Sequence, residues 1–129
     1  MPKLDSSFDY PRAALNEPVK RNSDGRWLPN TDAWITDDGL VIKVELAGLR
    51  REDLELSMEG NTLRINGRRA DGCRGEGCPC NFLIMEINYG EFESVIELPE
   101  GFDLSQARAA YQNGFLRIDV PKALGSKKQ

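Results

Sequence analysis

The residues best suited to chemistry in this chain of 129 residues are three cysteines that share the run CRGEGCPC. They are Cys73, Cys78 and Cys80. Thiolates bind zinc, but a structural zinc site takes four ligands, and the fourth would have to come from Asp71, Glu76, water or a second copy of the chain. The cluster is therefore only a weak candidate for a metal site. Inert reduced thiols, and disulfide formation or redox sensing, are the alternatives.

The rest of the inventory argues against an enzyme. The sequence has no histidine, so Ser-His, Cys-His and His-metal mechanisms cannot be built within it. The glycines of GCRGEG lack the spacing of a nucleotide-binding loop. Carboxylates are abundant, but Glu45, Glu55, Glu93 and Glu97 occupy single outward positions of expected strands, where a solvated face explains them. We expect no catalytic residue, no cofactor and no nucleotide.

The charge balance restricts the partners. Acidic residues outnumber basic ones by 21 to 17, which gives a formal net charge of −4. This charge opposes attraction to phosphate backbones and anionic lipid, so we expect no nucleic acid and no membrane as partner. No apolar run approaches the roughly 20 residues of a membrane span, and the amino terminus lacks the apolar segment of a signal peptide. These features favour a cytoplasmic protein.

From residue 33 onward, apolar and polar residues alternate with period two between turn residues, which predicts an all-β, antiparallel sandwich. About eight strands in two sheets are expected, with Gly60-Asn61 and Asn113-Gly114 as tight turns at positive φ. Residues 103–106 form one capped turn. The segments expected as strands include LVIKVEL, LELSMEG, TLRINGRR, FLIMEI, EFESVIELP, ARAAYQ and FLRIDV.

The two ends of the chain differ from this pattern. Residues 1–30 contain four prolines, scattered apolar residues and the polar run NSDG, which predicts a mostly flexible amino-terminal arm. Residues 31–122 then form the β-sandwich domain. Residues 123–129, rich in lysine, form a short flexible carboxyl-terminal tail.

Four segments, taken in order, point to a known family. AAYQNGFL resembles the A-x-x-x-N-G-x-L signature of the bacterial-type small heat-shock proteins, the α-crystallin family. VELAGLRREDLEL resembles their D-x-P-G-hydrophobic-x-x-x-D-I stretch, with Ala47 at the usual proline. NTLRINGRR resembles N-x-L-x-I-x-G-x-R, and NYGEFESVIELPEGFD resembles Y-G-x-F-x-R-x-F-x-L-P. The resemblance implies an immunoglobulin-like sandwich, the α-crystallin domain, in an ATP-independent holdase that binds partly unfolded proteins and suppresses their aggregation.

The resemblance also implies strand exchange in a homodimer. In bacterial-type members, the strand after the long loop pairs with the first domain strand of the partner protomer. FLIMEI is apolar on both faces except for its glutamate, which suits a strand covered by a second copy, although a central strand of one protomer is the alternative. By position, the pairing residues are Phe82, Leu83, Ile84, Met85, Glu86 and Ile87 on one side and Ala33, Trp34, Ile35 and Thr36 on the other.

A second implied surface is a groove between the LELSM and ARAAYQ strands, which in the family receives apolar segments. By position, its residues are Leu54, Leu56, Met58, Ala109 and Tyr111, and simple core packing is the alternative. The tail lacks the family's Ile-x-Ile type motif and the arm is short, so we expect a dimer or small oligomer. Two other functions stay open: a co-chaperone-like adaptor that docks on a folded partner, and a redox-responsive scaffold that uses the cysteine loop.

Overall fold

The computed structural model describes residues 21, 22, 25–70 and 80–125, and the regular elements there are strands and single 3₁₀ turns. No helix in this part of the chain is long and apolar enough to cross a bilayer. The all-β prediction is confirmed. The elements are β1 (Thr31–Ile35), β2 (Gly39–Glu45), η1 (Arg51–Asp53), β3 (Leu54–Glu59), β4 (Thr62–Arg69), β5 (Gly90–Glu97), η2 (Leu104–Gln106), β6 (Arg108–Gln112) and β7 (Phe115–Pro121).

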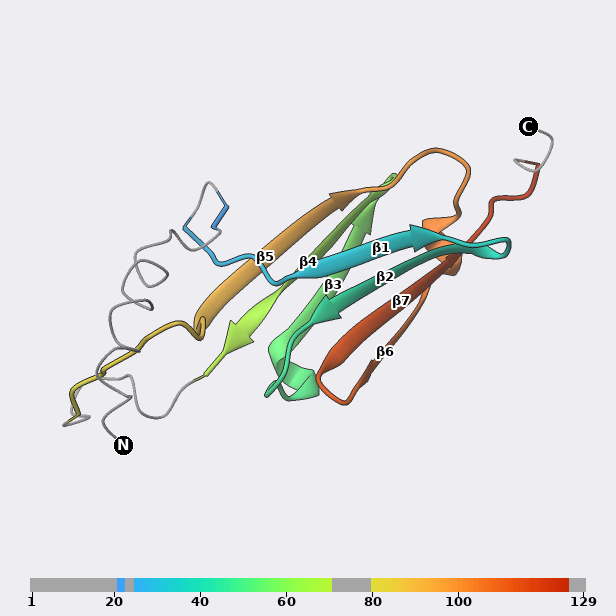
Figure 1. Cartoon of the computed structure of the whole chain (residues 1–129). Coiled ribbons are helices and arrows are strands. Elements are labelled where there is room, and N and C mark those ends of the chain that lie inside the picture. The colour runs from blue at the N-terminus through green and yellow to red at the C-terminus, as the bar shows by residue number, and fades with distance from the viewer. Residues whose placement is uncertain (1–20, 23–24, 71–79, 126–129) are drawn as a thin grey trace, which may run out of the picture.

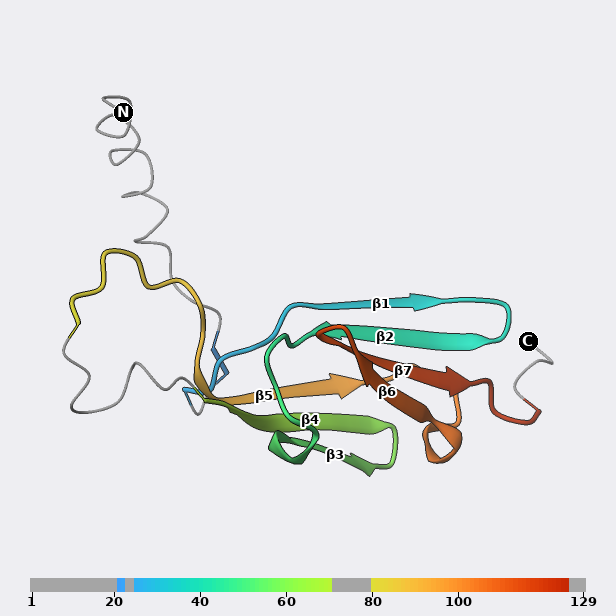
Figure 2. The same cartoon turned by 90° about the horizontal axis from the view of Figure 1, so that it is seen from below.

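The strands form two antiparallel sheets, in the orders β1-β2-β7-β6 and β3-β4-β5, which lie as two layers (Figures 1 and 2). Two-residue turns close the β3–β4 and β6–β7 hairpins. Asn113 and Gly114 have φ angles of 54° and 83°, as a turn matched to the twist of the strands requires. The other turn differs from the prediction, because only Gly60, and not Asn61, has a positive φ.

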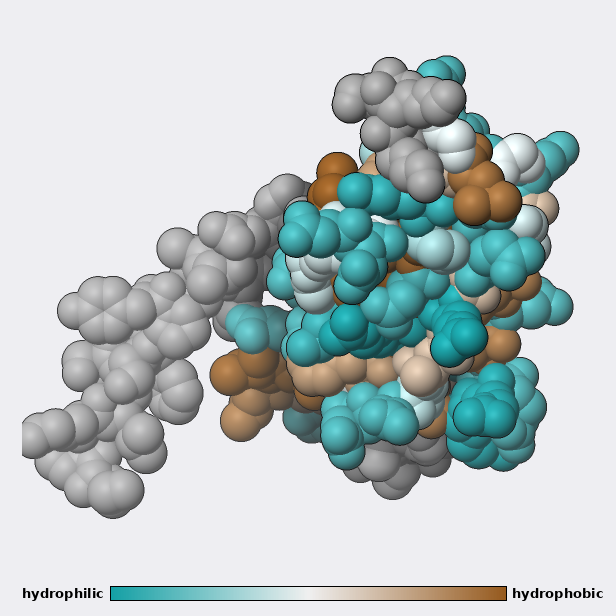
Figure 3. Space-filling view, turned by 90° about the vertical axis from the view of Figure 1, so that its right-hand side faces the viewer, coloured by the Kyte–Doolittle hydropathy of each residue, from teal (hydrophilic) through white to brown (hydrophobic). Residues whose placement is uncertain are grey.

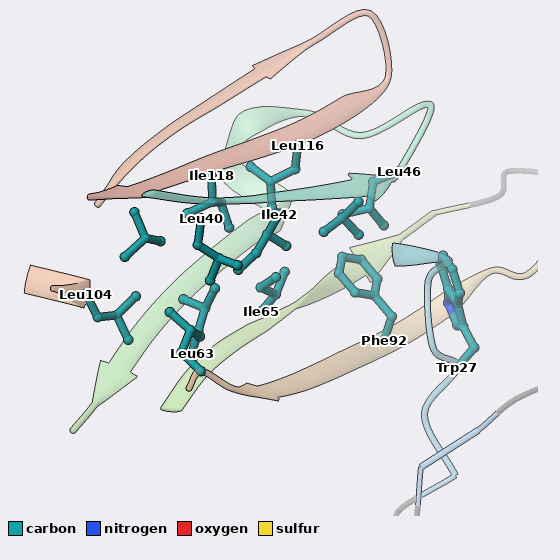
Figure 4. Close-up of a cluster of buried hydrophobic side chains, with 13 residues drawn as sticks. Trp27, Leu40, Ile42, Leu46, Leu63, Ile65, Phe92, Leu104, Leu116 and Ile118 are labelled. Carbon is teal, nitrogen blue, oxygen red and sulfur yellow. The ribbon is translucent and has the colours of Figure 1, made fainter. Parts of the chain in front are cut away.

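The core fills the space between the sheets, as the alternation predicted. In β2 the buried residues Leu40, Ile42 and Val44 face the opposite sheet, and β7 adds a matching row that includes Leu116 and Ile118 (Figure 4). Leu63, Ile65 and Phe92 meet them from β4 and β5. Burial of apolar side chains on this scale is the main stabilising term of such a fold. The predicted capped turn is also confirmed, since the Asp103 side chain accepts a hydrogen bond from the backbone of Ser105.

Trp27 belongs to this core, although its position falls within residues 1–30, where the sequence predicts an arm. Its side chain is only 3% exposed, and its ring centre lies 5.1 Å from that of Phe92. Its backbone N–H donates to the Glu91 carbonyl and its carbonyl accepts from Glu93, both at 3.2 Å. Residues next to Trp27 therefore cover part of the outer edge of β5. A single tryptophan beside a turn gives no periodic signal, so the sequence could not place it.

Glu93 corrects the prediction of a solvated outward carboxylate. Its side chain is 11% exposed and lies 3.3 Å from Arg26 and 3.2 Å from Arg64 in ion pairs. The Asn22 side-chain amide also donates to it, at 3.0 Å. Trp27 lies along β5, and the residues before it, Asn22 and Arg26, therefore reach the Glu93 side chain. A buried carboxylate is tolerated only with such partners.

Gly67 lies where two other segments of the chain approach β4 closely. A Cβ atom at this position of β4 would lie 2.1 Å from the Asp53 carbonyl oxygen and 2.8 Å from the Phe92 ring. We expect Gly67→Ala to lower the free energy of unfolding by about 2 kcal/mol or more, because backbone and core must shift. Urea denaturation measures this, with Asn66→Ala in the same strand as the control, expected within about 0.5 kcal/mol of the parent. Equal stability of the two variants would contradict the packing described.

Candidate interaction surfaces

Residues 82–87 are not a strand within this chain, so the alternative of a central strand of one protomer at FLIMEI is wrong. They lie between β4 and β5 in the chain, and this segment stands away from the two sheets (Figure 2). A strand needs a neighbouring strand to accept its ladder hydrogen bonds, and none of the described strands adjoins this segment. Its apolar side chains are 44% to 88% exposed: Phe82, Leu83, Ile84, Met85 and Ile87.

The strand expected to receive this segment is the edge strand β1. It pairs with β2 on one side only, and all five of its residues are exposed. Ala33, Trp34 and Ile35 lie in β1, whereas Thr36 follows it and closes the turn to Gly39 with a backbone hydrogen bond of 2.7 Å. The structure does not pair β1 with residues 82–87 of the same chain. Each has the row of backbone groups that the other would need, and their exchange between chains stays a prediction.

The predicted groove residues divide into two kinds. Leu54 and Tyr111 pack against the core and help to hold the sandwich together. Leu56 and Met58 are 38% and 55% exposed, against the alternative of simple core packing, because β3 is an edge strand that the opposite sheet does not fully cover. Ala109 on β6, the edge strand of the other sheet, is exposed as well. The face shown in Figure 3 has scattered hydrophobic residues among mostly hydrophilic ones.

The connector between β2 and β3 holds β6 at this side of the sandwich. The Tyr111 hydroxyl donates to the Leu46 carbonyl and accepts from the Leu49 backbone N–H. The backbone N–H of Leu46 donates to the Gly114 carbonyl at 2.8 Å, and a Cβ atom at Gly114 would approach Ala47 to 3.3 Å. The A-x-x-x-N-G-x-L segment therefore fixes β6 to the β2–β3 connector, and Tyr111 has a structural role there rather than serving as a free contact surface.

Arg69 is a cluster-forming residue that sequence reasoning missed. Its Nε donates to the Asn88 carbonyl at 2.9 Å and its Nη1 donates to the Ala47 carbonyl at 3.1 Å. The guanidinium carbon lies 4.5 Å from the centre of the Trp27 ring and 5.7 Å from that of Tyr89. Burial lowers the pKa of Arg69 from its ordinary value, and an arginine nevertheless stays protonated in proteins. The only available signal was its place as the last residue of the N-x-L-x-I-x-G-x-R pattern.

The cysteine candidates are only partly visible. Cys73 and Cys78 lie outside the described residues, and Cys80 is exposed. Within the described ranges, no group of three or more cysteine and carboxylate side chains is arranged to hold a metal ion. The metal, redox and inert alternatives therefore stand as they did from the sequence.

Two antiparallel sheets in two layers, with an exposed apolar segment outside them, define the class of protein: a small β-sandwich. A family model described as Hsp20/alpha crystallin family matches residues 32–129, and the chain belongs to this family. The predicted family and fold are thereby confirmed.

Individual relatives agree with this assignment. The chain is 29% identical over 120 residues to small heat shock protein C2 of Rickettsia felis, which covers 92% of this chain and 77% of that protein. It resembles the crystal structure of hspA from Xanthomonas axonopodis with a TM-score of 0.67 and 30% identity, covering 75% of this chain and 95% of the other. A small heat-shock protein from Xylella fastidiosa gives a TM-score of 0.69 at 27% identity, with 78% and 90% covered.

Removal of the Tyr111 hydroxyl tests the contact between β6 and the β2–β3 connector. We expect Tyr111→Phe to lower the free energy of unfolding by about 1 to 2 kcal/mol, because the Leu46 carbonyl and the Leu49 N–H both lose their partner. Thermal or urea denaturation measures the loss. Ser57→Ala on exposed β3 is the control that also removes one hydroxyl, and it should be close to neutral. A neutral Tyr111→Phe would show that the hydroxyl is not an anchor.

Proposed function

We propose that this protein is an ATP-independent holdase that works as a strand-exchanged homodimer or small oligomer. Membership of the small heat-shock protein family points to a chaperone rather than to an enzyme. The observation that carries the finer proposal is the coexistence, in one chain, of the open edge of β1 and the exposed apolar residues 82–87.

Exchange between two copies accounts for both features at once. An exposed strand edge is a template for a further strand, and an exposed apolar segment of this size marks a contact surface. If residues 82–87 of each copy lie along β1 of the other, the contact is made twice around a two-fold axis. The backbone groups of both segments gain ladder partners, and Trp34 and Ile35 lose contact with water.

Client capture uses the apolar side chains that remain. Leu56 and Met58 on the edge strand β3, with Ala109 across on β6, offer an apolar strip and a strand edge to unfolded segments. Binding the aggregation-prone species lowers its free concentration by mass action, and this requires neither nucleotide nor catalysis. An adaptor acting as a monomer on a folded partner is the alternative, and the exposed residues 82–87 favour the holdase.

We place the protein in the cytoplasm.

A charge in the exchanged segment should dissociate the dimer. Met85→Asp removes apolar burial and introduces a charge at two symmetric places, each costing about 2 kcal/mol, so we expect roughly a thousandfold weaker association. Size-exclusion chromatography with multi-angle light scattering, over a dilution series, measures it. Val95→Asp is the matched control, since Val95 is 51% exposed and Met85 54%. A parent protein that is monomeric at every concentration would reject strand exchange.

The holdase activity has its own test. Light scattering of a model protein unfolded by heat or by reduction should fall when this chain is added at near-equal mass without ATP. We expect Leu56→Ser with Met58→Ser to lose most of this protection at a temperature where the variant is still folded, because both side chains are exposed in the folded chain. Glu55→Ser with Glu59→Ser, on the other face of β3, is the control. Light scattering that is not reduced by the parent protein would contradict the proposed holdase activity.

A further inference from the structure

The two ends of the β4–β5 connection meet at one side chain. Arg69 is the last residue of β4, and its Nε donates to the carbonyl of Asn88, two residues before β5 begins. The guanidinium also lies over the ring of Tyr89, the residue directly before β5. One arginine therefore ties the exit of the connection from one sheet strand to its return into the next.

The same side chain ties this base to the rest of the sandwich. Its Nη1 donates to the carbonyl of Ala47, which follows β2 of the other sheet, and its charge lies 4.5 Å from the centre of the Trp27 ring. The Trp27 indole N–H in turn donates to the Gly90 carbonyl at 3.1 Å. Glu86 and Ile87 line the depression that Trp27 and Arg69 form. The exposed apolar segment thus leaves the body of the molecule directly from this cluster.

We propose that Arg69 is the positioning residue for assembly: it fixes the direction in which residues 82–87 leave the sandwich, and so holds them where β1 of a second copy can receive them. This inference rests on the proposed strand exchange and names the residue that controls it. Long connections sample many directions, and a partner can capture only those in which the segment reaches its edge. By fixing the end of the connection next to β5, Arg69 raises the fraction of chains in which residues 82–87 point in a direction that a partner can bind.

Arginine is suited to this position in a way that lysine is not. Its planar fork donates in two fixed directions at once and stacks on aromatic rings, whereas an ammonium group is a single, strongly hydrated charge. Lysine at residue 69 would keep the charge but could not bridge Asn88 and Ala47 while covering Trp27. The Arg69→Lys variant therefore separates geometry from charge.

The size of the effect follows from symmetry. The apparent dissociation constant rises as the competent fraction of each chain falls, and a two-fold dimer uses one connection from each copy. A tenfold fall in that fraction for each chain therefore weakens the dimer roughly a hundredfold. If Arg69 stabilised only the sandwich, its replacement would weaken the dimer by no more than the factor by which it lowers the folding equilibrium constant.

The experiment compares Arg69→Lys with Arg68→Lys in the full chain. Arg68 is the adjacent, exposed residue of the same strand, so the control makes the same chemical change one position away. Sedimentation equilibrium measures the dimer dissociation constant of each. Hydrogen exchange of the β2 and β7 amides, at concentrations giving equal dimer fractions, measures the stability of the sandwich. We expect roughly a hundredfold weaker dimer for Arg69→Lys, with core exchange unchanged, and no effect of Arg68→Lys.

Three results would overturn the inference, and they can be told apart. A dimer that is as tight in Arg69→Lys as in the parent would remove Arg69 from assembly and leave strand exchange standing. Core amides that exchange faster by the same factor as the dimer weakens would make Arg69 a residue of fold stability alone. A parent chain that is monomeric, or a dimer indifferent to Met85→Asp, would reject the strand exchange itself and the inference with it.

Discussion

Backbone groups at strand edges are the constraint on which the rest of this structure depends. Two open sheets leave β1 and β6 at the edges of one layer and β3 and β5 at the edges of the other. Each edge strand has a row of N–H and C=O groups without a ladder partner, and such rows attract further strands. The chain treats these edges differently. Residues around Trp27 cover part of β5, while β1, β3 and β6 pair with no further described strand along their outer edges and consist mostly of exposed residues.

The open edges explain why function in such a protein is a matter of association. Among the described residues, exposed apolar side chains lie close to the open edges on β1 and β3, and on residues 82–87 outside the two sheets. Association with a second copy satisfies the backbone and removes the apolar surface from water in one step. Association with an unfolded segment uses the same two terms. A dimer and a client complex therefore draw on one kind of interaction at different edges.

The strands with periodic sequence patterns could be predicted from the sequence, and the contacts between residues distant in the sequence could not. Alternation in LVIKVEL and FLRIDV places Leu40, Ile42 and Leu116 in the core, and Asn113-Gly114 marks a turn, because these features depend on neighbours in sequence. The burial of Glu93 depends on Asn22, 71 positions away, and Trp27 depends on Gly90, 63 positions away. The same limit explains residues 82–87: the apolar pattern predicts a strand, but a strand exists only where a partner strand is supplied.

The segments that identify the family contain residues fixed by close packing together with some of the residues proposed to act in association, such as Leu56 and Arg69. Gly67 is required where β4 meets Asp53 and Phe92, and Gly114 where a hairpin meets Ala47, so these positions are dictated by close packing. Leu56, Met58 and Met85 are exposed and under no such packing constraint within the chain. Signature residues at such close contacts specify the sandwich fold and, with it, which strands lie at the edges of the sheets. In the proposals made above, client binding and assembly depend on exposed side chains such as Met58 and Met85 and on Arg69, which is itself part of a signature segment.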